Sequence, residues 1–568
     1  MTDSEALLAR AGRLTAAGDA PGAFGLYREA ARLHPTCAPA WLGMSGLLLA
    51  RGDEGGATQV LSHGMAAVGA DAEGRAQLAG PFADRIGKLR PTGWHAPIER
   101  DLRILFGEAV DHQRLARVTA LILLGKAETK DEGEVALYRI AEDPLWSGFL
   151  ARCLNVEPAM ETRLAAIRAA VAGRAGRLME ARARLVCALA LQAFASEYVL
   201  EPVAASQAGD DVDAVLLSCL DRRLIDLAPS EATLRAIEAR GGHLGVLLVR
   251  RTLTDLQREA GLAHAVPTSG ASPGPEDTVS AKVRAQYEAN PYPRWTAPPT
   301  PTPAALIDHI RALPGVDIGR LPVGPLKVLV AGCGTGFEAI DLAWMDPTLA
   351  ITAMDLSRRS LSYGMRMAQD LGVGTITFQQ GDILDLAQAP ASFDVATSTG
   401  VLHHMDDPVA GLRAIGQAVR PGGVVRVALY SERARSPVVA AHRLIREQGL
   451  KATPDGVRAF RAQVLAAPSE SPLAALKTSD DLYSLSGCRD LAFHAHERRF
   501  TPPQVADLVG AAGMTLAGFD APPPAMDAFH SAFGARADPL DLRLWARLEV
   551  QEPFLFAGMY AVWCQTPG

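Results

Sequence analysis

The stretch that decides the fold is Val328-Leu329-Val330-Ala331-Gly332-Cys333-Gly334-Thr335-Gly336, an apolar run that ends in three alternating glycines. Such a run predicts a buried strand that turns tightly into the next element. Because glycine has no Cβ, Gly332, Gly334 and Gly336 allow the backbone to turn sharply and to approach a ligand closely. The stretch therefore predicts a ligand site at the carboxyl end of this strand.

Three more apolar segments follow, and each ends in polar residues or glycine. They are 350–354 before Asp355, 376–379 before Gly381-Asp382-Ile383, and 393–397 before Gly400-Val401-Leu402-His403-His404. An acid placed like Asp355, nineteen residues past Gly336, can accept hydrogen bonds from ribose hydroxyls. We expect these four strand ends to meet at one crevice.

The glycine spacing separates two classes of cofactor. A dinucleotide-binding loop reads G-x-G-x-x-G and receives a pyrophosphate at a helix N-terminus. Here the third glycine comes one residue earlier, as G-x-G-x-G. A ligand without phosphates fits this loop better.

Together with Arg420-Pro421-Gly422-Gly423 before the strand 424–429, these motifs resemble the class I S-adenosylmethionine (SAM)-dependent methyltransferases. The resemblance covers residues 321 to 430 and implies a Rossmann-like, seven-stranded α/β domain with SAM as its cofactor. It also implies a set of cofactor-binding residues. Gly332, Gly334 and Gly336 would pass under the methionyl part, Asp355 would hold the ribose, Asp382 and Ile383 would flank the adenine, and Leu356 and Thr399 complete the set.

One position departs from the family pattern. The family usually has an acidic residue two positions before the first glycine, where this chain has Val330. We therefore expect the ammonium group of the cofactor to be held from elsewhere in the chain.

The composition is that of a globular protein with several domains. At 568 residues the chain exceeds a single core, so we expect three or more units. Its net charge of −7 argues against a nucleic-acid substrate.

The seven cysteines are scattered without a C-x-x-C pair, so we expect no metal site and no disulfide framework. The first residues, Met1-Thr2-Asp3-Ser4-Glu5, lack a basic region followed by an apolar block. No apolar run approaches the roughly 18 residues that span a bilayer. We expect a cytoplasmic protein that does not associate with a membrane.

The first half of the chain is predicted to be all-α. Residues 34 apart match in size and character over 1–80, and this period resembles tetratricopeptide (TPR) repeats. Leucine and alanine recur at helical spacing over 81–264, which predicts an all-α domain able to cover the repeats. The Pro/Gly/Ser-rich segment 265–280 is predicted to be a linker.

The segment 281–320 begins with the aromatic sequence Tyr287-Glu288-Ala289-Asn290-Pro291-Tyr292-Pro293-Arg294-Trp295. Its prolines stiffen the chain, which favours a lid or a docking surface. Together with the repeats, this sequence resembles a group of bacterial repeat-containing methyltransferases. We expect Tyr287, Tyr292 and Arg294 to contact substrate, and the alternative is an aromatic plug that seals the seam between domains.

After the cofactor-binding core at 321–435, a helical insertion at 436–500 is expected to roof the substrate pocket. It contributes Tyr483 as a further substrate residue. Segment 501–568, with a helix starting at Thr501-Pro502 and strands at 514–519 and 559–564, completes the seven strands.

The catalytic candidates depend on the acceptor atom. An amine or hydroxyl needs a base, for which His403, His404 and His494 are candidates, with Glu497 or Asp490 as orienting groups. A carboxylate needs only placement, for which Arg489 is the candidate. For His403 and His404, shaping the pocket is the first interpretation and general base the second.

The predicted function is a SAM-dependent methyltransferase whose helical half recruits a protein or peptide substrate. The first alternative is a small-molecule methyltransferase that uses the helical half as a cap or to form a homodimer. The second alternative is a SAM-binding scaffold without turnover.

Overall fold

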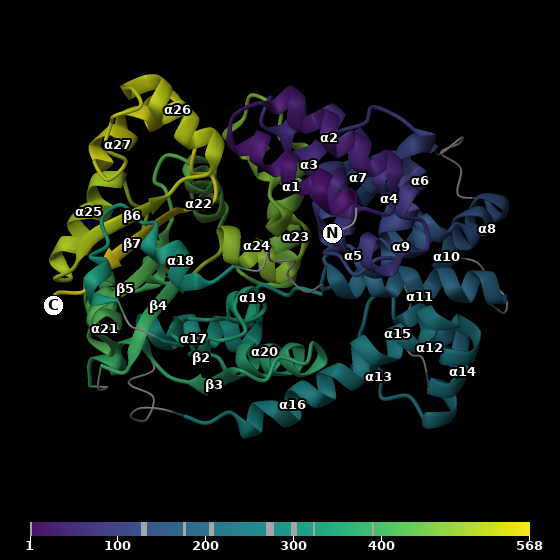
Figure 1. Ribbon diagram of the computed structural model, residues 1–568. Coiled ribbons are helices and arrows are strands. Elements are labelled where there is room, and N and C mark those ends of the chain that lie inside the picture. The colour runs from purple at the N-terminus through teal and green to yellow at the C-terminus, as the bar shows by residue number, and fades with distance from the viewer. Residues whose placement is uncertain are drawn as a thin grey trace. The chain divides into compact units, whose positions relative to one another are not determined.

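The computed structural model describes residues 3–126, 133–173, 178–203, 209–268, 278–296, 304–321, 324–388 and 391–568. It divides into two compact units (Figure 1). Of the described residues, the first unit holds those up to 253 and Thr296, and the second holds those within 254–295 and 304–568.

Every element of the first unit among the described residues is helical. Its elements are α1 Asp3–Ala16, α2 Ala20–Leu33, α3 Ala38–Leu49, α4 Glu54–Val68, α5 Ala72–Ile86, α6 Ala96–Leu105, η1 His112–Leu115, α7 Ala116–Lys126, α8 Glu134–Glu142, α9 Pro144–Arg152, α10 Pro158–Ala172, α11 Glu180–Ala195, α12 Val212–Ser218, α13 Leu224–Leu227, α14 Glu231–Gly241 and α15 His243–Val249. The π-helical turn η2, Arg250–Thr254, follows. The predicted all-α half is confirmed.

The first five helices pack each against the next along the chain. Aromatic rings pack against glycines: a Cβ added to Gly43 would lie 2.6 Å from the Tyr27 ring, and one added to Gly64 would lie 2.9 Å from Trp41. The helices α2 and α4 begin at Ala20 and Glu54, which is the 34-residue offset of the sequence pattern. The assignment to the TPR family stays a prediction.

The second unit is built on one seven-stranded sheet in the order β3-β2-β1-β4-β5-β7-β6. The strands are β1 Lys327–Ala331, β2 Ala350–Asp355, β3 Ile376–Gln380, β4 Phe393–Thr399, β5 Val419–Leu429, β6 Thr515–Asp520 and β7 Tyr560–Gln565. The first five run parallel, and β7 is antiparallel to both of its neighbours. The predicted Rossmann-like, seven-stranded fold is confirmed.

Helices cover both faces of this sheet. They are α16 Asp255–Ala265, α17 Val279–Ala289, α18 Leu306–Arg311, α19 Phe337–Met345, α20 Arg358–Asp370, α21 Pro408–Ala418, α22 Ser436–Gln448, α23 Pro454–Ala466, α24 Leu485–Ala492, α25 Pro502–Ala511, α26 Pro523–Phe533 and α27 Leu542–Gln551. The 3₁₀ turns are η3 Ile318–Arg320, η4 Ile383–Gln388, η5 Leu402–His404, η6 Pro472–Thr478 and η7 Asp480–Tyr483. The longest described helix in the protein, α11, has 16 residues, and no described helix is long and apolar enough to cross a membrane.

The strand β1 shows why the sheet has two cores. Successive side chains of a strand point to opposite faces. Val328 and Val330 lie in a core with residues of α18, α19 and α20, whereas Leu329 and Ala331 lie in a second core with residues of α21, α25 and α27. The continuous apolar run of the sequence therefore corresponds to a strand that is buried on both faces.

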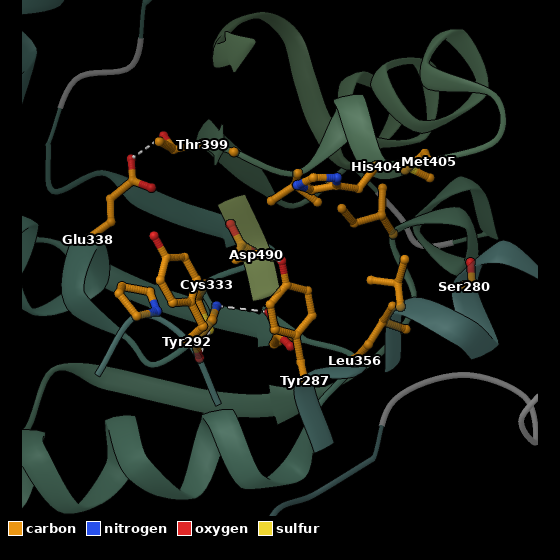
Figure 2. Close-up of a pocket in the computed structure, with 18 of the residues that line it drawn as sticks. Ser280, Tyr287, Tyr292, Cys333, Glu338, Leu356, Thr399, His404, Met405 and Asp490 are labelled. Atoms are coloured by element: carbon orange, nitrogen blue, oxygen red, sulfur yellow. Dashed lines mark hydrogen bonds between the residues drawn. The ribbon is translucent and has the colours of Figure 1, made fainter. Parts of the chain in front are cut away.

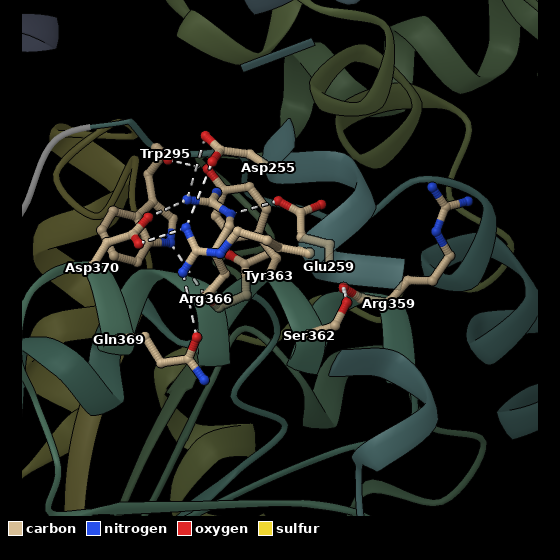
Figure 3. Close-up of polar contacts among 11 residues, drawn as sticks. Asp255, Glu259, Trp295, Arg359, Ser362, Tyr363, Arg366, Gln369 and Asp370 are labelled. Atoms are coloured by element: carbon tan, nitrogen blue, oxygen red, sulfur yellow. Dashed lines mark hydrogen bonds and ion pairs between the residues drawn. The ribbon is translucent and has the colours of Figure 1, made fainter. Parts of the chain in front are cut away.

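The helix α16 packs against α20, so the second unit begins before the expected linker at 265–280. Figure 3 shows the contact that joins the two helices: the Arg366 guanidinium lies 2.8 Å from Glu259 and 3.9 Å from Asp255, both on α16. Its central carbon also lies 4.8 Å from the centre of the Tyr363 ring. The chain therefore passes into the second unit after Leu253, and residues 269–277 of the expected linker lie outside the described residues.

Candidate active site

A cavity of about 340 Å³ lies at the carboxyl ends of β1 to β5 in the second unit (Figure 2). Its lining residues come from the glycine loop, the strand ends, α17 and the insertion, and most of its surface is apolar. The residues expected from the sequence that line it are Gly332, Gly334, Asp355, Leu356, Asp382, Ile383, Thr399, His404, Asp490, Tyr287 and Tyr292. The structure thus brings most of the predicted cofactor set together with two of the predicted substrate residues.

The glycine loop is held to the end of β2 by Asp355. Its two carboxylate oxygens accept hydrogen bonds from the backbone N–H groups of Gly334 and Ser357, each at 2.8 Å. Burial raises the pKa of Asp355, and these hydrogen bonds oppose the shift. A carboxylate has about four acceptor sites, so Asp355 can still accept hydrogen bonds from a ligand in the cavity.

Gly332 is required for close packing of the loop. Its φ of +77° lies in the left-handed region, and an added Cβ would lie 2.4 Å from a methyl group of Val401. The same loop ends at Gly336, which caps α19 and does not line the cavity.

Glu338, in the first turn of α19, is a lining residue that the sequence analysis did not single out. Its Oε1 lies 3.2 Å from the Thr399 hydroxyl, which donates to it, and 3.8 Å from the Arg426 guanidinium (Figure 2). Burial raises the pKa of this carboxyl group. Its position two residues past the glycine loop is the only sequence signal that could have indicated it.

The aromatic segment and the insertion form one wall of the cavity. Tyr287, on α17, donates a hydrogen bond to Asp490 at 2.7 Å, and Tyr292 donates one to Asp481 at 2.7 Å. Both acids belong to the insertion; Asp490 is buried and Asp481 is half-buried, and desolvation raises the pKa of each to about 6. These two contacts hold the aromatic segment against the roof.

Two histidines share one backbone acceptor beside this wall. The Nδ1 atoms of His404 and His494 each lie 2.7 Å from the carbonyl oxygen of His496. Because a carbonyl only accepts, Nδ1 of His404 carries hydrogen and its Nε2 keeps a lone pair. Nδ1 of His494 also lies 3.2 Å from the backbone N–H of His496, which donates to it. Burial lowers the pKa of His404 well below 6.5 and that of His494 to about 4, so both rings are neutral near pH 7.

His403 lies behind this pair and does not line the cavity. It is fully buried, and its ring stacks on that of Tyr430 with 3.9 Å between centroids. Neither ring nitrogen has a hydrogen-bond partner among the described residues. His404 reaches the cavity and His403 does not, and the pocket-shaping role expected for the two stays a prediction.

Ligand atoms of His404, Asp490 and His494 lie within 4.8 Å of one another, close enough to consider a metal ion. The two imidazoles, however, are stacked at 3.5 Å with 20° between their planes. Lone pairs in nearly parallel rings run side by side and do not converge on one ion. This geometry favours proton transfer over metal binding.

The other predicted residues lie outside the cavity. The Glu497 carboxylate pairs with Arg435 and Arg499, so its hydrogen bonds go to arginines and it does not orient a histidine. Arg489 donates to Asn290 and to the carbonyl of Ala452. Two predicted substrate residues also point elsewhere: the Tyr483 hydroxyl donates to the Lys477 carbonyl, and Arg294 lies over the Tyr363 ring.

Comparison with known proteins places a methyltransferase domain in the second unit. A family model described as "Methyltransferase domain" matches residues 324–463. An uncharacterised protein of Synechococcus is 31% identical over 254 residues, 43% of this chain and 60% of the relative. The ubiquinone biosynthesis O-methyltransferase of Paracidovorax citrulli is 32% identical over 123 residues, 22% of this chain and 51% of the relative.

Among solved structures, PKMT2 from Rickettsia typhi in complex with AdoHcy is similar with a TM-score of 0.36 and 16% identity, over 48% of this chain and 55% of that one. This chain spans less than two thirds of the length of these relatives. The match over 324–463 contains the glycine loop, Asp355 and His404. The prediction of a SAM-dependent methyltransferase domain is thereby confirmed, and SAM is its cofactor.

Proposed function

We propose that this protein is a SAM-dependent O-methyltransferase whose acceptor is a small molecule with an acidic hydroxyl, such as a phenol. The observation that carries the proposal is the neutral His404, whose Nε2 lone pair is available in a mainly apolar cavity beside the glycine loop. All the described residues that line the cavity belong to the second unit. Its volume of about 340 Å³ suits a cofactor with a small acceptor group.

The residues expected to bind the cofactor lie along the carboxyl ends of the strands, in the order of the strands in the sheet. Asp382 lies after β3, and Asp355 lies at the end of β2. Glu338 and Thr399 lie at the carboxyl ends of β1 and β4, the neighbouring strands at which the strand order reverses. With the adenine at β3 and the ribose at Asp355, the methionyl end would lie near Glu338. The residues present therefore fit SAM along its whole length.

SAM supplies a methyl group on a positively charged sulfur, and a nucleophile takes this group by in-line displacement. The chain's own task is to align the acceptor and to remove its proton. Nε2 of His404 would accept the proton of the acceptor hydroxyl as that oxygen takes the methyl group. The His496 carbonyl keeps the ring in the required tautomer throughout.

The lowered pKa of His404 indicates the kind of acceptor. A weakly basic imidazole removes a proton best from a hydroxyl that is itself acidic. Phenols meet this condition better than aliphatic alcohols do. The name of the Paracidovorax relative, an O-methyltransferase, agrees with this choice.

A protein or peptide acceptor is the second candidate. The observation that favours it is the separate all-α unit, whose described residues supply none of the lining of the cavity. Helices packed consecutively along the chain, as α1 to α5 are, commonly present a surface for polypeptides. In this case one side chain of the substrate would enter the cavity.

The test is to incubate the full-length protein with methyl-labelled SAM and a cell extract, and then to separate macromolecules from metabolites. We expect label in the low-mass fraction, in a form that resists mild base as a methyl ether does. Label in polypeptide would establish the second candidate instead. Binding of S-adenosylhomocysteine (SAH) without label in either fraction would support the scaffold alternative.

A further inference from the structure

We infer that Glu338 is the counter-ion for the ammonium group at the methionyl end of the cofactor. The inference rests on the proposed function and names the residue that takes the place of an acid on the first strand. Val330, where such an acid would lie, is apolar and 1% exposed, so β1 offers no carboxylate to the cavity.

The position of Glu338 supports this role. It lies in the first turn of α19, directly after the glycine loop, and it lines the cavity together with Gly332 and Thr399. A helix N-terminus favours a negative side chain in its first turn, which helps to keep this carboxylate charged. The Thr399 hydroxyl fixes Oε1 from the neighbouring strand end.

The charge balance around Glu338 leaves room for a cation. Burial raises the pKa of the Glu338 carboxyl group, yet 27% of its side-chain surface stays exposed. This exposed part faces the cavity. Among the described residues, the cation paired with Glu338 is Arg426, at 3.8 Å, beyond hydrogen-bond range, and Arg426 lies closer to Asp520, at 3.1 Å. Glu338 thus shares its cation with Asp520, and a ligand ammonium at hydrogen-bond distance would give this half-buried carboxylate a closer partner.

The other acids of the cavity are engaged differently. Both carboxylate oxygens of Asp355 accept hydrogen bonds from backbone N–H groups at the end of β2. Asp382 accepts one from the N–H of Leu384. Asp490 accepts from the Tyr287 hydroxyl on the far wall. Glu338 is thus the acid that lies at the β1–β4 end of the cavity.

The test compares two ligands in two proteins. One ligand is SAH, which keeps the ammonium group, and the other is an SAH analogue in which hydrogen replaces the α-amino group. Both are titrated calorimetrically into the full-length protein and its Glu338→Gln variant. Glutamine keeps the shape of the glutamate side chain, and its amide oxygen still accepts from the Thr399 hydroxyl. Circular dichroism and the melting temperature report whether the variant is folded.

We expect the unaltered protein to prefer SAH over the analogue by roughly 30-fold or more, the size expected for a desolvated charge pair. Glu338→Gln should weaken SAH binding by a similar factor and leave the analogue nearly unaffected, so the preference falls to a few-fold. Asp355→Ala is the matched control, because it should weaken both ligands in parallel and keep their ratio.

A preference that is unchanged in Glu338→Gln would overturn the inference. Thr399→Val gives a second measurement, since loss of the donor to Oε1 should reduce the preference without removing the charge. Failure of the unaltered protein to bind SAH at all would instead overturn the proposed function, so the two failures are distinguishable.

Discussion

The hydroxyl of Tyr287 donates a hydrogen bond to Asp490 at 2.7 Å, joining residues that lie 203 positions apart in the chain. It also lies 3.3 Å from Nε2 of His494, whose ring is stacked on that of His404. The aromatic segment therefore reaches His494 and the roof of the cavity with a single side chain. Under the proposed function, this contact makes the segment part of the acceptor site as well as its wall.

Replacing Tyr287 by phenylalanine should lower kcat/KM about tenfold and leave the SAH dissociation constant within about twofold. The change removes one hydrogen bond to a buried carboxylate, which is worth about 1–3 kcal/mol, while the glycine loop and Asp355 are untouched. Steady-state kinetics and SAH calorimetry separate the two effects. Tyr483→Phe is the control, because its hydroxyl bonds the Lys477 carbonyl away from the cavity. An equal loss in both variants would show that the effect is merely structural.

Replacing His404 by glutamine should lower kcat by about 100-fold or more, as expected for loss of a general base. SAH binding should persist, because no predicted cofactor contact is removed. The residual rate should rise with pH as the acceptor hydroxyl ionises without help. A pH–rate profile on the phenolic acceptor found by extract labelling checks this result. His63→Gln, which removes an exposed imidazole, is the control, and a flat profile in His404→Gln would count against the base.

The sheet and the glycine loop could be predicted from the sequence because both depend on local patterns. Apolar runs of strand length ending at Asp355 or Gly381 mark buried parallel strands, and the structure ends β2 at Asp355. The helix start at Thr501 was predicted in the same way, and the structure shows its capping box with Gln504. Each of these features is decided by neighbours in the chain.

The contacts of the acceptor side could not be predicted because they join distant segments. Glu497 is an acid close in sequence to His494, which made it a reasonable orienting group, yet it pairs with Arg435. The group that orients both histidines is the backbone carbonyl of His496, which any residue would supply and no sequence pattern reveals. The placement of α16 on α20 through Arg366 is hidden for the same reason, since polar residues on a helix face usually indicate exposure.

Asp355 provides a prediction on the cofactor side. Asp355→Ala should weaken SAH binding by about 30-fold to 1,000-fold, since it removes a charged acceptor worth on the order of 2–4 kcal/mol. It also releases the N–H groups of Gly334 and Ser357, so the loop loses its anchor. Asp355→Asn keeps one carbonyl acceptor and should lose less. Calorimetry on the folded variants checks the order, and equal affinity in all three proteins would contradict the assignment of the ribose site.

Asp481 should make the stability of the protein depend on pH. Burial raises its pKa to about 6 from a usual 3.8, so the folded state binds its proton more tightly than the unfolded state does. Below about pH 4 the group is neutral in both states and there is no penalty. Between pH 4 and 6 the folded state loses stability as the pH rises, by at most about 3 kcal/mol for a shift of this size.

Asp481→Asn cannot ionise, and its amide oxygen can still accept from the Tyr292 hydroxyl. Its melting temperature relative to the unaltered protein should therefore be higher at pH 7.5 than at pH 4.5. Thermal unfolding at the two pH values measures this difference, with Asp455→Asn as the control for loss of an exposed carboxylate. A difference between variant and unaltered protein that stays the same at both pH values would show that Asp481 carries its charge in the folded state without cost, and the contact with Tyr292 would then be a strong ionic hydrogen bond.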